Sequence, residues 1–508
     1  MNKGLLCDKK LSFEDCELTI LRMAVDKAQE RVGSETVKSP EIVKMITILE
    51  NFLRRKRLIC YGGTALNNIM PKQDKFYNKD IEIPDYDFFS TNALQDTKEL
   101  CDIYIKEGFV EVEGKPGMHH GTFKVFVNFI PIADITFLQK DIFNAVKKES
   151  ISVAGISYAA PNFLRMSMFL ELSRPEGDNS RFEKVLKRLN LLNKNYPITS
   201  KNCGEVDFQR DMEDKTNENE IFENIKNTLV DQGVVFFGGY ALSLYSNYMP
   251  KPLQKQFKKY PDFDVLSEEP LIVAQIIKER LGDIGVKHVK VVKKNAIGEI
   301  IAPHYEIKIG NDTVVFIYEP MACHSYNEIK IQGRDVKIAT IDTILSFYLA
   351  FLYASRDYYD TDRIICMAQY LFKVQQENRL KQKGLLRRFS ISCYGHQQTI
   401  EEIRAAKAAK FLELKDKKGT LEYEEYFLRY RPGDKLKSST TTSTSTSTST
   451  PNNNRMRIKN NRKSTMRNIT NKQYKQDKSK TRQSRQTKNN ANNKKKSKGS
   501  KKWSWLQP

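Results

Sequence analysis

The chain has 508 residues, which is too long for one ordinary domain of about 150 residues. Its net charge of +22 is concentrated in residues 435–508, where 21 Lys and Arg stand against one acid, Asp477, so this segment carries +20 and the rest +2. No stretch approaches the ~18 apolar residues of a membrane span, and the first ten residues lack a signal-peptide core, which predicts an intracellular protein without a membrane partner.

The cysteines and histidines show no ligand pattern. The eight cysteines are scattered without a Cys-x-x-Cys pair, and the six histidines form no cluster with ligand spacing. This distribution argues against a structural zinc site or a secreted disulfide scaffold and predicts reduced thiols.

Two helical regions are predicted at the start of the chain. Ser12 and Asp15 form an S-x-x-D start signal before apolar residues at helical spacing, so residues 1–38 are predicted to be an N-terminal helical segment. Ser39 and Pro40 begin a second helix as N-cap and first-turn residue. That helix ends in four basic residues, 54–57, which suit the negative end of its dipole.

The body of the chain contains an internal repeat. Residues 58–66 read LICYGGTAL and residues 234–242 read VVFFGGYAL, each an apolar run, a Gly-Gly pair and the start of a predicted helix. PDYDF and PDFDV follow, with 22 residues from Gly63 to Asp85 and 23 from Gly239 to Asp262. Each copy is also preceded and followed by predicted helices, namely 39–57 and 161–173 in the first, and 217–231 and 341–354 in the second.

The repeat predicts an α/β (α+β) protein with two tandem domains of mixed sheets and flanking helices. The predicted parts are an N-terminal helical segment at 1–38, a first copy at 39–198, a second copy with C-terminal helices at 199–433 and a disordered basic tail at 434–508. The tail is rich in Ser, Thr, Asn, Lys and Arg and buries too little to offset chain entropy. Its charge suits either a solubilising role or a sequence-independent polyanion tether.

The Gly62-Gly63 turn and the Asp85-x-Asp87 strand suggest phosphate and metal chemistry. Glycines let the backbone approach a phosphate, the following helix offers free N–H groups, and Thr64 adds a hydroxyl donor. Asp85 and Asp87 project from one face of a strand, and their carboxylates repel unless a divalent cation such as Mg²⁺ lies between them. Taken separately, each motif also fits an ordinary turn or a surface strand.

Asp134 is a lone acid in an apolar strand predicted over Val125–Leu138. A buried carboxylate needs a partner or a metal. If this strand lies beside the Asp85-x-Asp87 strand, three carboxylates converge near the Gly-Gly turn, as two-metal nucleotidyl transfer requires. Asp134 is then the predicted general base.

Gly62-Gly63-Thr64, Asp85-Tyr86-Asp87 and Asp134 resemble the GG[S/T], DxD and later single Asp of the DNA polymerase β-like nucleotidyltransferases. Over residues 40–430, the tandem copies and their spacing more specifically resemble the poly(A) polymerase catalytic subunit of poxviruses and giant DNA viruses. The Lys-, Asn- and Ile-rich composition favours the Mimivirus-like branch. The resemblance implies that Asp85, Asp87 and Asp134 are catalytic acids that bind Mg²⁺ or Mn²⁺, and that Gly62, Gly63 and Thr64 hold the ATP triphosphate.

The activity implied by this resemblance is template-independent addition of AMP from ATP to the 3′ end of mRNA. Another RNA terminal nucleotidyltransferase, either uridylyl or CCA adding, and a non-catalytic RNA-binding processivity subunit stay open as alternatives. The resemblance also implies a cytoplasmic location in the viral factory. Packaging in the virion, a homodimer and a separate processivity partner are left open.

The second copy is predicted to be catalytically inactive. It keeps Asp262 and Asp264, but Phe316 aligns with Asp134, and Tyr240 replaces Thr64 with a ring that would crowd the phosphate site. Its predicted role is to wall the cleft and hold RNA through the lysines and aromatic residues of loop 251–260, for which a plain solvated loop is the alternative.

Cations after Asp134 are predicted to reach the nucleotide. Arg165 follows the strand region, and Lys184 lies at helical spacing with Arg181 and Arg188. Arg165 and Lys184 are predicted to bind the triphosphate, and the alternative is an ordinary charged helix face.

Overall fold

The computed structural model describes residues 12–200, 203–208, 217–254, 257 and 260–433, which belong to one compact unit. The predicted disordered tail, residues 434–508, lies outside the described residues. Among the described residues, no helix combines the length and the apolar character needed to cross a membrane.

The two N-terminal helices begin where the sequence predicts. The Ser12 hydroxyl accepts the Asp15 N–H at 3.1 Å at the start of α1 (Phe13–Val37), and the Ser39 hydroxyl accepts the Ile42 N–H at 3.3 Å at the start of α2 (Pro40–Lys56). Helix α2 ends at Arg57, whose left-handed backbone has a φ of 53°. Helix α2 packs five apolar side chains into the core, whereas α1 buries none.

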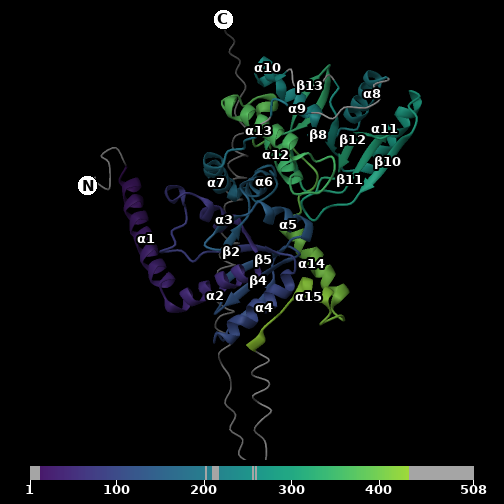
Figure 1. Ribbon diagram of the computed structural model, residues 1–508. Coiled ribbons are helices and arrows are strands. Elements are labelled where there is room, and N and C mark those ends of the chain that lie inside the picture. The colour runs from purple at the N-terminus through teal and green to yellow at the C-terminus, as the bar shows by residue number, and fades with distance from the viewer. Residues whose placement is uncertain (1–11, 201–202, 209–216, 255–256, 258–259, 434–508) are drawn as a thin grey trace, which may run out of the picture. The chain divides into compact units, whose positions relative to one another are not determined.

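The first copy forms a seven-stranded mixed sheet in the order β3-β4-β5-β2-β1-β7-β6. The strands are β1 (Ile59–Tyr61), β2 (Tyr86–Ser90), β3 (Val112–Pro116), β4 (Thr122–Val127), β5 (Ile130–Phe137), β6 (Ile151–Val153) and β7 (Ile156–Tyr158). The helices are α3 (Gly62–Ile69), α4 (Ala93–Lys106), α5 (Lys140–Lys148), α6 (Pro161–Leu172) and α7 (Phe182–Asn195). Figure 1 shows α4 beside β4 and β5, and it contacts both strands.

The strand predicted over Val125–Leu138 is instead a hairpin of β4 and β5. Asn128 and Phe129 turn the chain with φ angles of 48° and 68°. Two consecutive left-handed residues match the twist of a tight antiparallel hairpin, but a Phe in that position is not a turn signal that the sequence offers. The hairpin places Lys124 of β4 directly opposite Asp134 of β5.

The second copy repeats this sheet topology strand for strand. Its order is β10-β11-β12-β9-β8-β14-β13-β15, so that β8 and β9 correspond to β1 and β2 and β12 corresponds to β5, with one extra edge strand. The strands are β8 (Val235–Phe236), β9 (Phe263–Leu266), β10 (Val289–Lys294), β11 (His304–Ile309), β12 (Asp312–Tyr318), β13 (His324–Ile331), β14 (Arg334–Ala339) and β15 (Cys393–Tyr394). The internal repeat and the predicted fold class are therefore confirmed.

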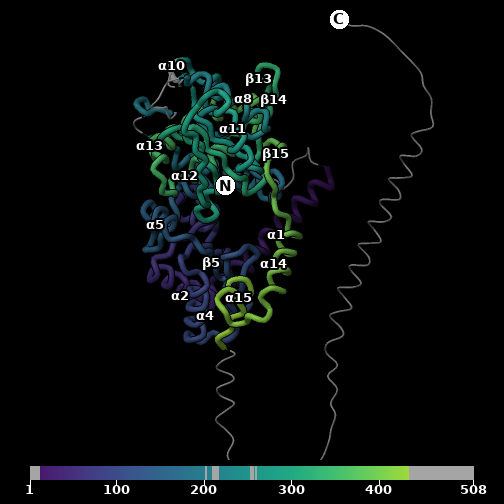
Figure 2. Tube along the Cα trace, turned by 90° about the vertical axis from the view of Figure 1, so that its right-hand side faces the viewer, coloured from purple at the N-terminus to yellow at the C-terminus, as the bar shows by residue number. Residues whose placement is uncertain are grey.

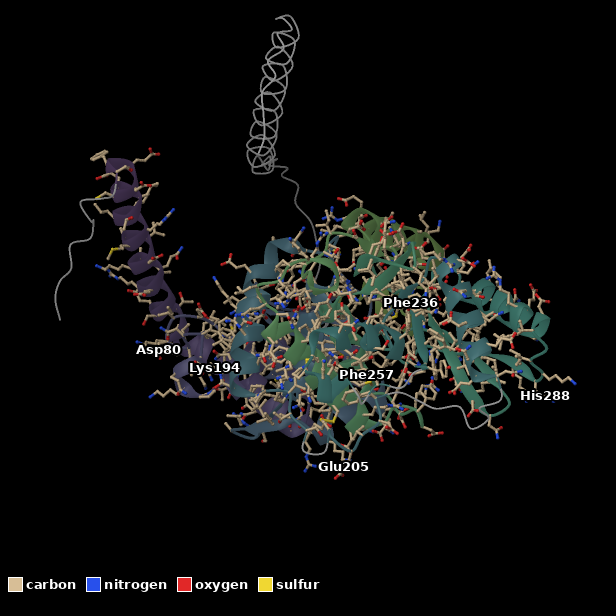
Figure 3. All side chains as sticks on the ribbon, turned by 90° about the horizontal axis from the view of Figure 1, so that it is seen from above. Asp80, Lys194, Glu205, Phe236, Phe257 and His288 are labelled. Atoms are coloured by element: carbon tan, nitrogen blue, oxygen red, sulfur yellow. A yellow bond between two sulfur atoms is a disulfide. The ribbon has the colours of Figure 1, made fainter. Side chains whose placement is uncertain are left out.

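Helices cover the second sheet as they cover the first. They are α8 (Glu218–Asp231), α9 (Gly239–Tyr245), α10 (Lys251–Gln254), α11 (Pro270–Asp283), α12 (Ile341–Phe351) and α13 (Thr361–Glu377). In Figure 3, Phe236 of β8 lies among the packed side chains of this copy, and His288 marks the exposed turn before β10.

Two sets of contacts join the copies. Helix α6 packs against α12, and the rings of Phe163 and Tyr353 meet edge to face at 5.1 Å. The last helices, α14 (Ile400–Leu414) and α15 (Leu421–Phe427), return to the first sheet, as Figure 2 shows. There Lys98 pairs with Glu424 at 2.6 Å, and the Gly114 N–H donates to the Tyr430 carbonyl at 2.8 Å. The domain limits at 198 and 433 stay predictions.

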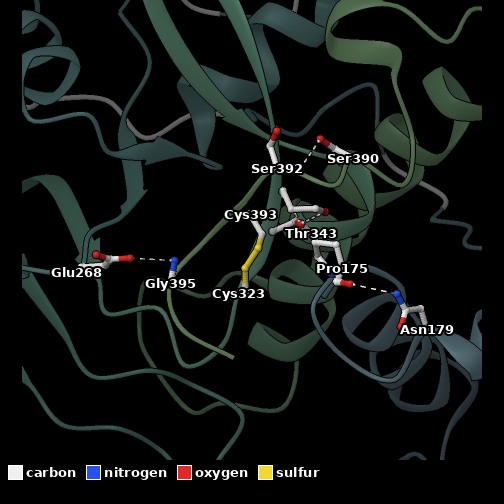
Figure 4. The surroundings of a disulfide bond; sticks show 10 residues. Pro175, Asn179, Glu268, Cys323, Thr343, Ser390, Ser392, Cys393 and Gly395 are labelled. Carbon is white, nitrogen blue, oxygen red and sulfur yellow. Dashed lines mark hydrogen bonds between the residues drawn. A yellow bond between two sulfur atoms is a disulfide. The ribbon is translucent and has the colours of Figure 1, made fainter. Parts of the chain in front are cut away.

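The structure contradicts the prediction of reduced thiols. Cys203 is disulfide-bonded to Cys366 with a Cα–Cα separation of 5.3 Å, and Cys323 is bonded to Cys393 with a separation of 5.2 Å; Figure 4 shows the second of these bonds. The partners are 163 and 70 residues apart in the chain, so only the fold brings them together. Among the described cysteines, Cys60 and Cys101 are free and buried.

Candidate active site

The Gly-Gly turn connects β1 to α3, and neighbouring side chains require both glycines. Gly62 has a φ of 70°, and a Cβ there would lie 2.5 Å from Asp87 Oδ2. A Cβ on Gly63 would lie 2.5 Å from Tyr77 Oη and 3.1 Å from both terminal nitrogens of Arg188. No described side chain caps the start of α3, so the N–H groups of its first turn are available to an anion.

The three acids lie on neighbouring strands beside this turn. Asp85 immediately precedes β2, and Asp87 lies within it. Strands β2 and β5 are parallel, with Asp87 in register with Asp134, and β1 lies on the other side of β2 with Tyr61 opposite Asp87. The predicted adjacency of the two acid-bearing strands is therefore confirmed.

The acids are electrostatically coupled. Burial, followed by the Asp85 and Asp134 carboxylates, raises the pKa of Asp87 to about 7, although Lys124 and Arg181 act in the opposite direction. Asp85 is exposed as a residue, but the protein around its carboxyl group removes part of its hydration. This, followed by Asp134, raises the pKa of Asp85. Carboxyl groups that disfavour simultaneous ionisation have the chemistry of a cation site.

These oxygen donors fit a hard divalent cation such as Mg²⁺ or Mn²⁺. Among the described residues, the three carboxylates do not form a group within 4.8 Å of one another, and Asp134 is ion-paired with Lys124 instead. Sequence reasoning missed Lys124, because its position opposite Asp134 depends on the hairpin turn at residues 128–129.

The Thr64 hydroxyl donates to the Asp85 carbonyl oxygen. This bond ties the first turn of α3 to the residue that enters β2. The hydroxyl proton predicted to reach a phosphate is therefore used, in this structure, to join the turn to the acids.

Arg165 does not lie at the site, and its predicted role as a triphosphate ligand is wrong. The residue is 0% exposed in α6, and burial lowers its pKa to about 10. Its Nε donates to Asn193 Oδ1 at 2.7 Å, while its terminal nitrogens donate to the Asn162 side chain and the Tyr196 carbonyl. Arg165 thus joins α6 to α7. Its spacing in the sequence could not distinguish a buried structural arginine from a ligand.

Helix α7 brings other cations to the acids and the turn. Lys184 is exposed, and its positive charge partly opposes the rise in the pKa of Asp85. Arg188 stacks over the rings of Phe76 and Tyr77, with centroid distances of 4.9 and 5.4 Å, and donates from Nη2 to Tyr77 Oη at 2.6 Å. Tyr77 was not predicted, because a tyrosine in a loop carries no motif.

A cavity of about 490 Å³ is lined by Asp85, though not by Asp87 or Asp134. Thr64, Asn67, Tyr77 and Asp85 are among the residues that line it. This volume lies within the range of sites that bind nucleotide-sized ligands.

The second copy has the same register without the same chemistry. Phe316 of β12 is in register with Asp264 of β9, as Asp134 is with Asp87, so the predicted replacement of the third acid is confirmed. Opposite Phe316 lies Glu306, where the first copy has Lys124. Glu306 is fully buried and lies 3.6 Å from Lys294 and 3.7 Å from Lys308.

The turn of the second copy is closed. The Tyr240 ring packs against Phe222, Phe236 and Phe263 in an aromatic core, so the prediction that it crowds the phosphate site is wrong. The cavity that contains Asp262 and Asp264 holds only about 30 Å³, far less than a nucleotide needs. Three of the residues lining it are Tyr358, Tyr359 and Arg363. The lysines at 255, 258 and 259 of the predicted RNA-binding loop lie outside the described residues.

Comparisons with known proteins address the same segment. The family model for the poly(A) polymerase catalytic subunit matches residues 47–178, which include both glycines and all three acids. A protein of Acanthamoeba polyphaga mimivirus assigned as such a subunit is 33% identical over 183 residues, or 35% of this chain and 30% of that protein. A protein of African swine fever virus with the same assignment is 31% identical over 164 residues, or 31% of this chain and 34% of that protein.

The chain therefore spans about a third of the length of the curated relatives it matches. The crystal structure of the Megavirus polyadenylate synthase superimposes with a TM-score of 0.71 over 86% of this chain and 89% of that one, at 20% identity. That likeness shows a shared fold over both copies. The resemblance to poly(A) polymerase catalytic subunits of giant DNA viruses, predicted from the motifs, is confirmed for residues 47–178, and the chain has the fold of the Megavirus enzyme.

Proposed function

We propose that this protein is a template-independent poly(A) polymerase that transfers AMP from ATP to the 3′ hydroxyl of mRNA. One observation carries the proposal: Asp87 and Asp134 are in register on adjacent parallel strands beside the Gly62-Gly63 turn, and Asp85 directly precedes the strand of Asp87. This arrangement occurs within the segment that is similar to poly(A) polymerase catalytic subunits.

In this proposal the turn binds the triphosphate. The Gly62 and Gly63 backbone and the free N–H groups of α3 face the phosphate oxygens, and Lys184 supplies a cation near Asp85. Arg188, held by Tyr77 over Gly63, offers a guanidinium with fixed geometry to the leaving pyrophosphate.

The acids supply the remaining chemistry. Asp85, Asp87 and Asp134 would hold Mg²⁺ or Mn²⁺, which when bound polarises the phosphoryl group and favours ionisation of the attacking hydroxyl. A carboxylate oxygen of Asp134 accepts the proton of the RNA 3′ hydroxyl. Lys124 of β4 lies opposite Asp134 of β5, and their ion pair fixes the orientation of the Asp134 carboxylate.

RNA is the proposed partner, and the second copy supports the first without performing chemistry. Its cavity of about 30 Å³ and its Phe316 leave neither the space nor the third acid for a second reaction. A cytoplasmic viral-factory location belongs to the same proposal as a consequence of the resemblance, whereas packaging in the virion, a homodimer and a separate processivity partner stay open.

The choice of nucleotide tests this proposal. The protein is incubated with a labelled RNA primer, Mg²⁺ or Mn²⁺, and each of the four ribonucleoside triphosphates in turn. We expect long homopolymeric extension with ATP and little with the others. Preferential use of UTP, or addition limited to CTP followed by ATP, would instead establish a uridylyl or CCA-adding enzyme.

A further inference from the structure

A second cluster of ligand-forming side chains lies where the two copies meet. Glu176 follows α6 in the first copy, Cys323 immediately precedes β13, and Cys393 begins β15. One carboxylate oxygen and the two sulfur atoms all lie within 4.8 Å of one another. Figure 4 shows the loop that includes Pro175 and Asn179 near the bond between the two cysteines.

The backbone around this cluster is well tied. The Ser325 N–H donates to the Ser173 carbonyl at 2.8 Å, which joins β13 to the end of α6. Ser325 is in register with Cys393, and the Gly395 N–H donates to Glu268 Oε1 at 3.1 Å. Ligand-bearing segments fixed in this way can hold three donor atoms together without large rearrangement.

The chemistry of the donors points to a borderline-soft cation. Two thiolates and a carboxylate are ligands that Zn²⁺ accepts, and with one water they complete a tetrahedron. Cys323 is 1% exposed, whereas Glu176 is exposed, so a metal could enter from the Glu176 side. Glu176 makes no hydrogen bond or ion pair with any other described residue, so its carboxylate is available.

The charge around the cluster also suits a bound metal. Two thiolates, one carboxylate and Zn²⁺ together carry a single negative charge. Arg174, two residues before Glu176, is half-buried, and its Nε atom is buried with no hydrogen-bond partner among the described residues. Arg174 thus carries a positive charge and an unpaired donor two residues from one of the candidate ligands.

The other described disulfide provides a contrast. Cys203 and Cys366 have nearly the same Cα–Cα separation as Cys323 and Cys393. Among the described residues, no acid or histidine joins them in a group with ligand spacing. The carboxylate therefore distinguishes one cysteine pair from the other.

We propose that Glu176, Cys323 and Cys393 bind one Zn²⁺ when the Cys323–Cys393 disulfide is reduced. A phosphine or dithiol reductant supplies two electrons that break the S–S bond, and two protons complete the thiols. Zinc then displaces those two protons as two Zn–S bonds form, and Glu176 adds an oxygen ligand. The bound metal would connect the first copy to the second across the α6–β13 contact.

Metal content of the full-length protein tests this proposal. The protein is reduced under anaerobic conditions, equilibrated with Zn²⁺, dialysed and analysed for zinc, and a parallel sample is loaded with Co²⁺ for absorption spectroscopy. We expect about one zinc per chain in the reduced protein and none in the oxidised protein. The cobalt form should show a thiolate-to-cobalt charge-transfer band.

Matched variants locate the site. Cys323→Ser and Cys393→Ser should each abolish the cobalt band, and Glu176→Gln, which changes an exposed residue and leaves the fold intact, should weaken zinc binding at least ~10-fold. The double variant Cys203→Ser/Cys366→Ser should bind zinc as the unmodified protein does. The proposal would be overturned if the cobalt band persisted in Cys323→Ser or disappeared only in the Cys203/Cys366 control. It would also be overturned if Glu176→Gln bound zinc with unchanged affinity, or if the reduced protein took up no zinc.

Discussion

Asp87 shows how one partly buried carboxyl group couples the site to the stability of the fold. Its carboxyl group has a pKa of about 7 in the folded chain, above its ordinary value, because of burial and then of its neighbouring acids. As pH rises from about 4 to about 7, the unfolded chain has lost this proton while the folded chain retains it. The free energy of unfolding of the metal-free protein should therefore fall across that window.

Thermal unfolding in EDTA between pH 5 and pH 8 measures this effect. The melting temperature of the unmodified protein should decrease as pH rises, while that of Asp87→Asn should change less and be the higher of the two at pH 8. Added Mg²⁺ should restore stability to the unmodified protein alone. Parallel pH profiles for the two proteins would show that Asp87 is not perturbed.

Alanine variants of Arg165 and Lys184 should show separate effects, the first on the stability of the fold and the second on nucleotide binding. Arg165→Ala leaves three part-buried acceptors without this donor and removes a fully buried side chain, so it should cost about 2–5 kcal/mol of unfolding free energy. Lys184→Ala removes an exposed cation near Asp85 and should raise the KM for ATP several-fold with little change in melting temperature. Denaturant unfolding and steady-state kinetics measure both effects, and a large KM increase in a fully stable Arg165→Ala would restore the role rejected above.

Among the elements, the strands and turns that carry the site motifs could be predicted from the sequence. The Gly-Gly and Asp-x-Asp motifs were readable because a strand's period of two and a turn's need for glycine are local properties. Asp134 could be placed because its strand is apolar apart from that acid. Lys124 and Tyr77 could not be placed, since their positions depend on a left-handed Phe129 and on a loop that packs against α7.

The closed second copy leads to a prediction about its β12 strand. Phe316→Asp would restore the missing third acid in register with Asp264, yet it should not create activity, because the cavity there is about 30 Å³. It should lower stability by several kcal/mol, since Phe316 is fully buried and the new charge has no assured partner. The test combines Phe316→Asp with Asp87→Asn in the primer assay, in which any ATP-dependent extension would contradict this account of the second copy.

For the whole molecule, contacts far apart in sequence connect the copies. Helix α6 packs on α12, and α15 returns to the first sheet through the Lys98–Glu424 pair. No local pattern could predict that return, so the C-terminal helices were grouped with the second copy alone. The cysteine pairings escaped prediction for the same reason.

The charge of the chain belongs mainly to residues 435–508, and its effect can be measured directly. If this segment tethers RNA, a 1–433 truncation should bind RNA more weakly, with a shallower dependence of affinity on salt concentration, because fewer counterions are released. Product lengths should shorten while single-nucleotide addition is retained. Equal affinities and equal salt slopes for the two forms would leave the solubilising role.

The most direct test of the central claim compares matched asparagine variants of the two copies. Asp85→Asn and Asp262→Asn each neutralise the first acid of an Asp-x-Asp motif, the residue directly before β2 in the first copy and directly before β9 in the second. Extension of an RNA primer with ATP should fall by at least ~100-fold in Asp85→Asn, because an acid that binds the metal is lost. Extension should be retained within a few-fold in Asp262→Asn. Comparable loss of extension in both variants, with both proteins folded, would contradict the assignment of the reaction to the first copy.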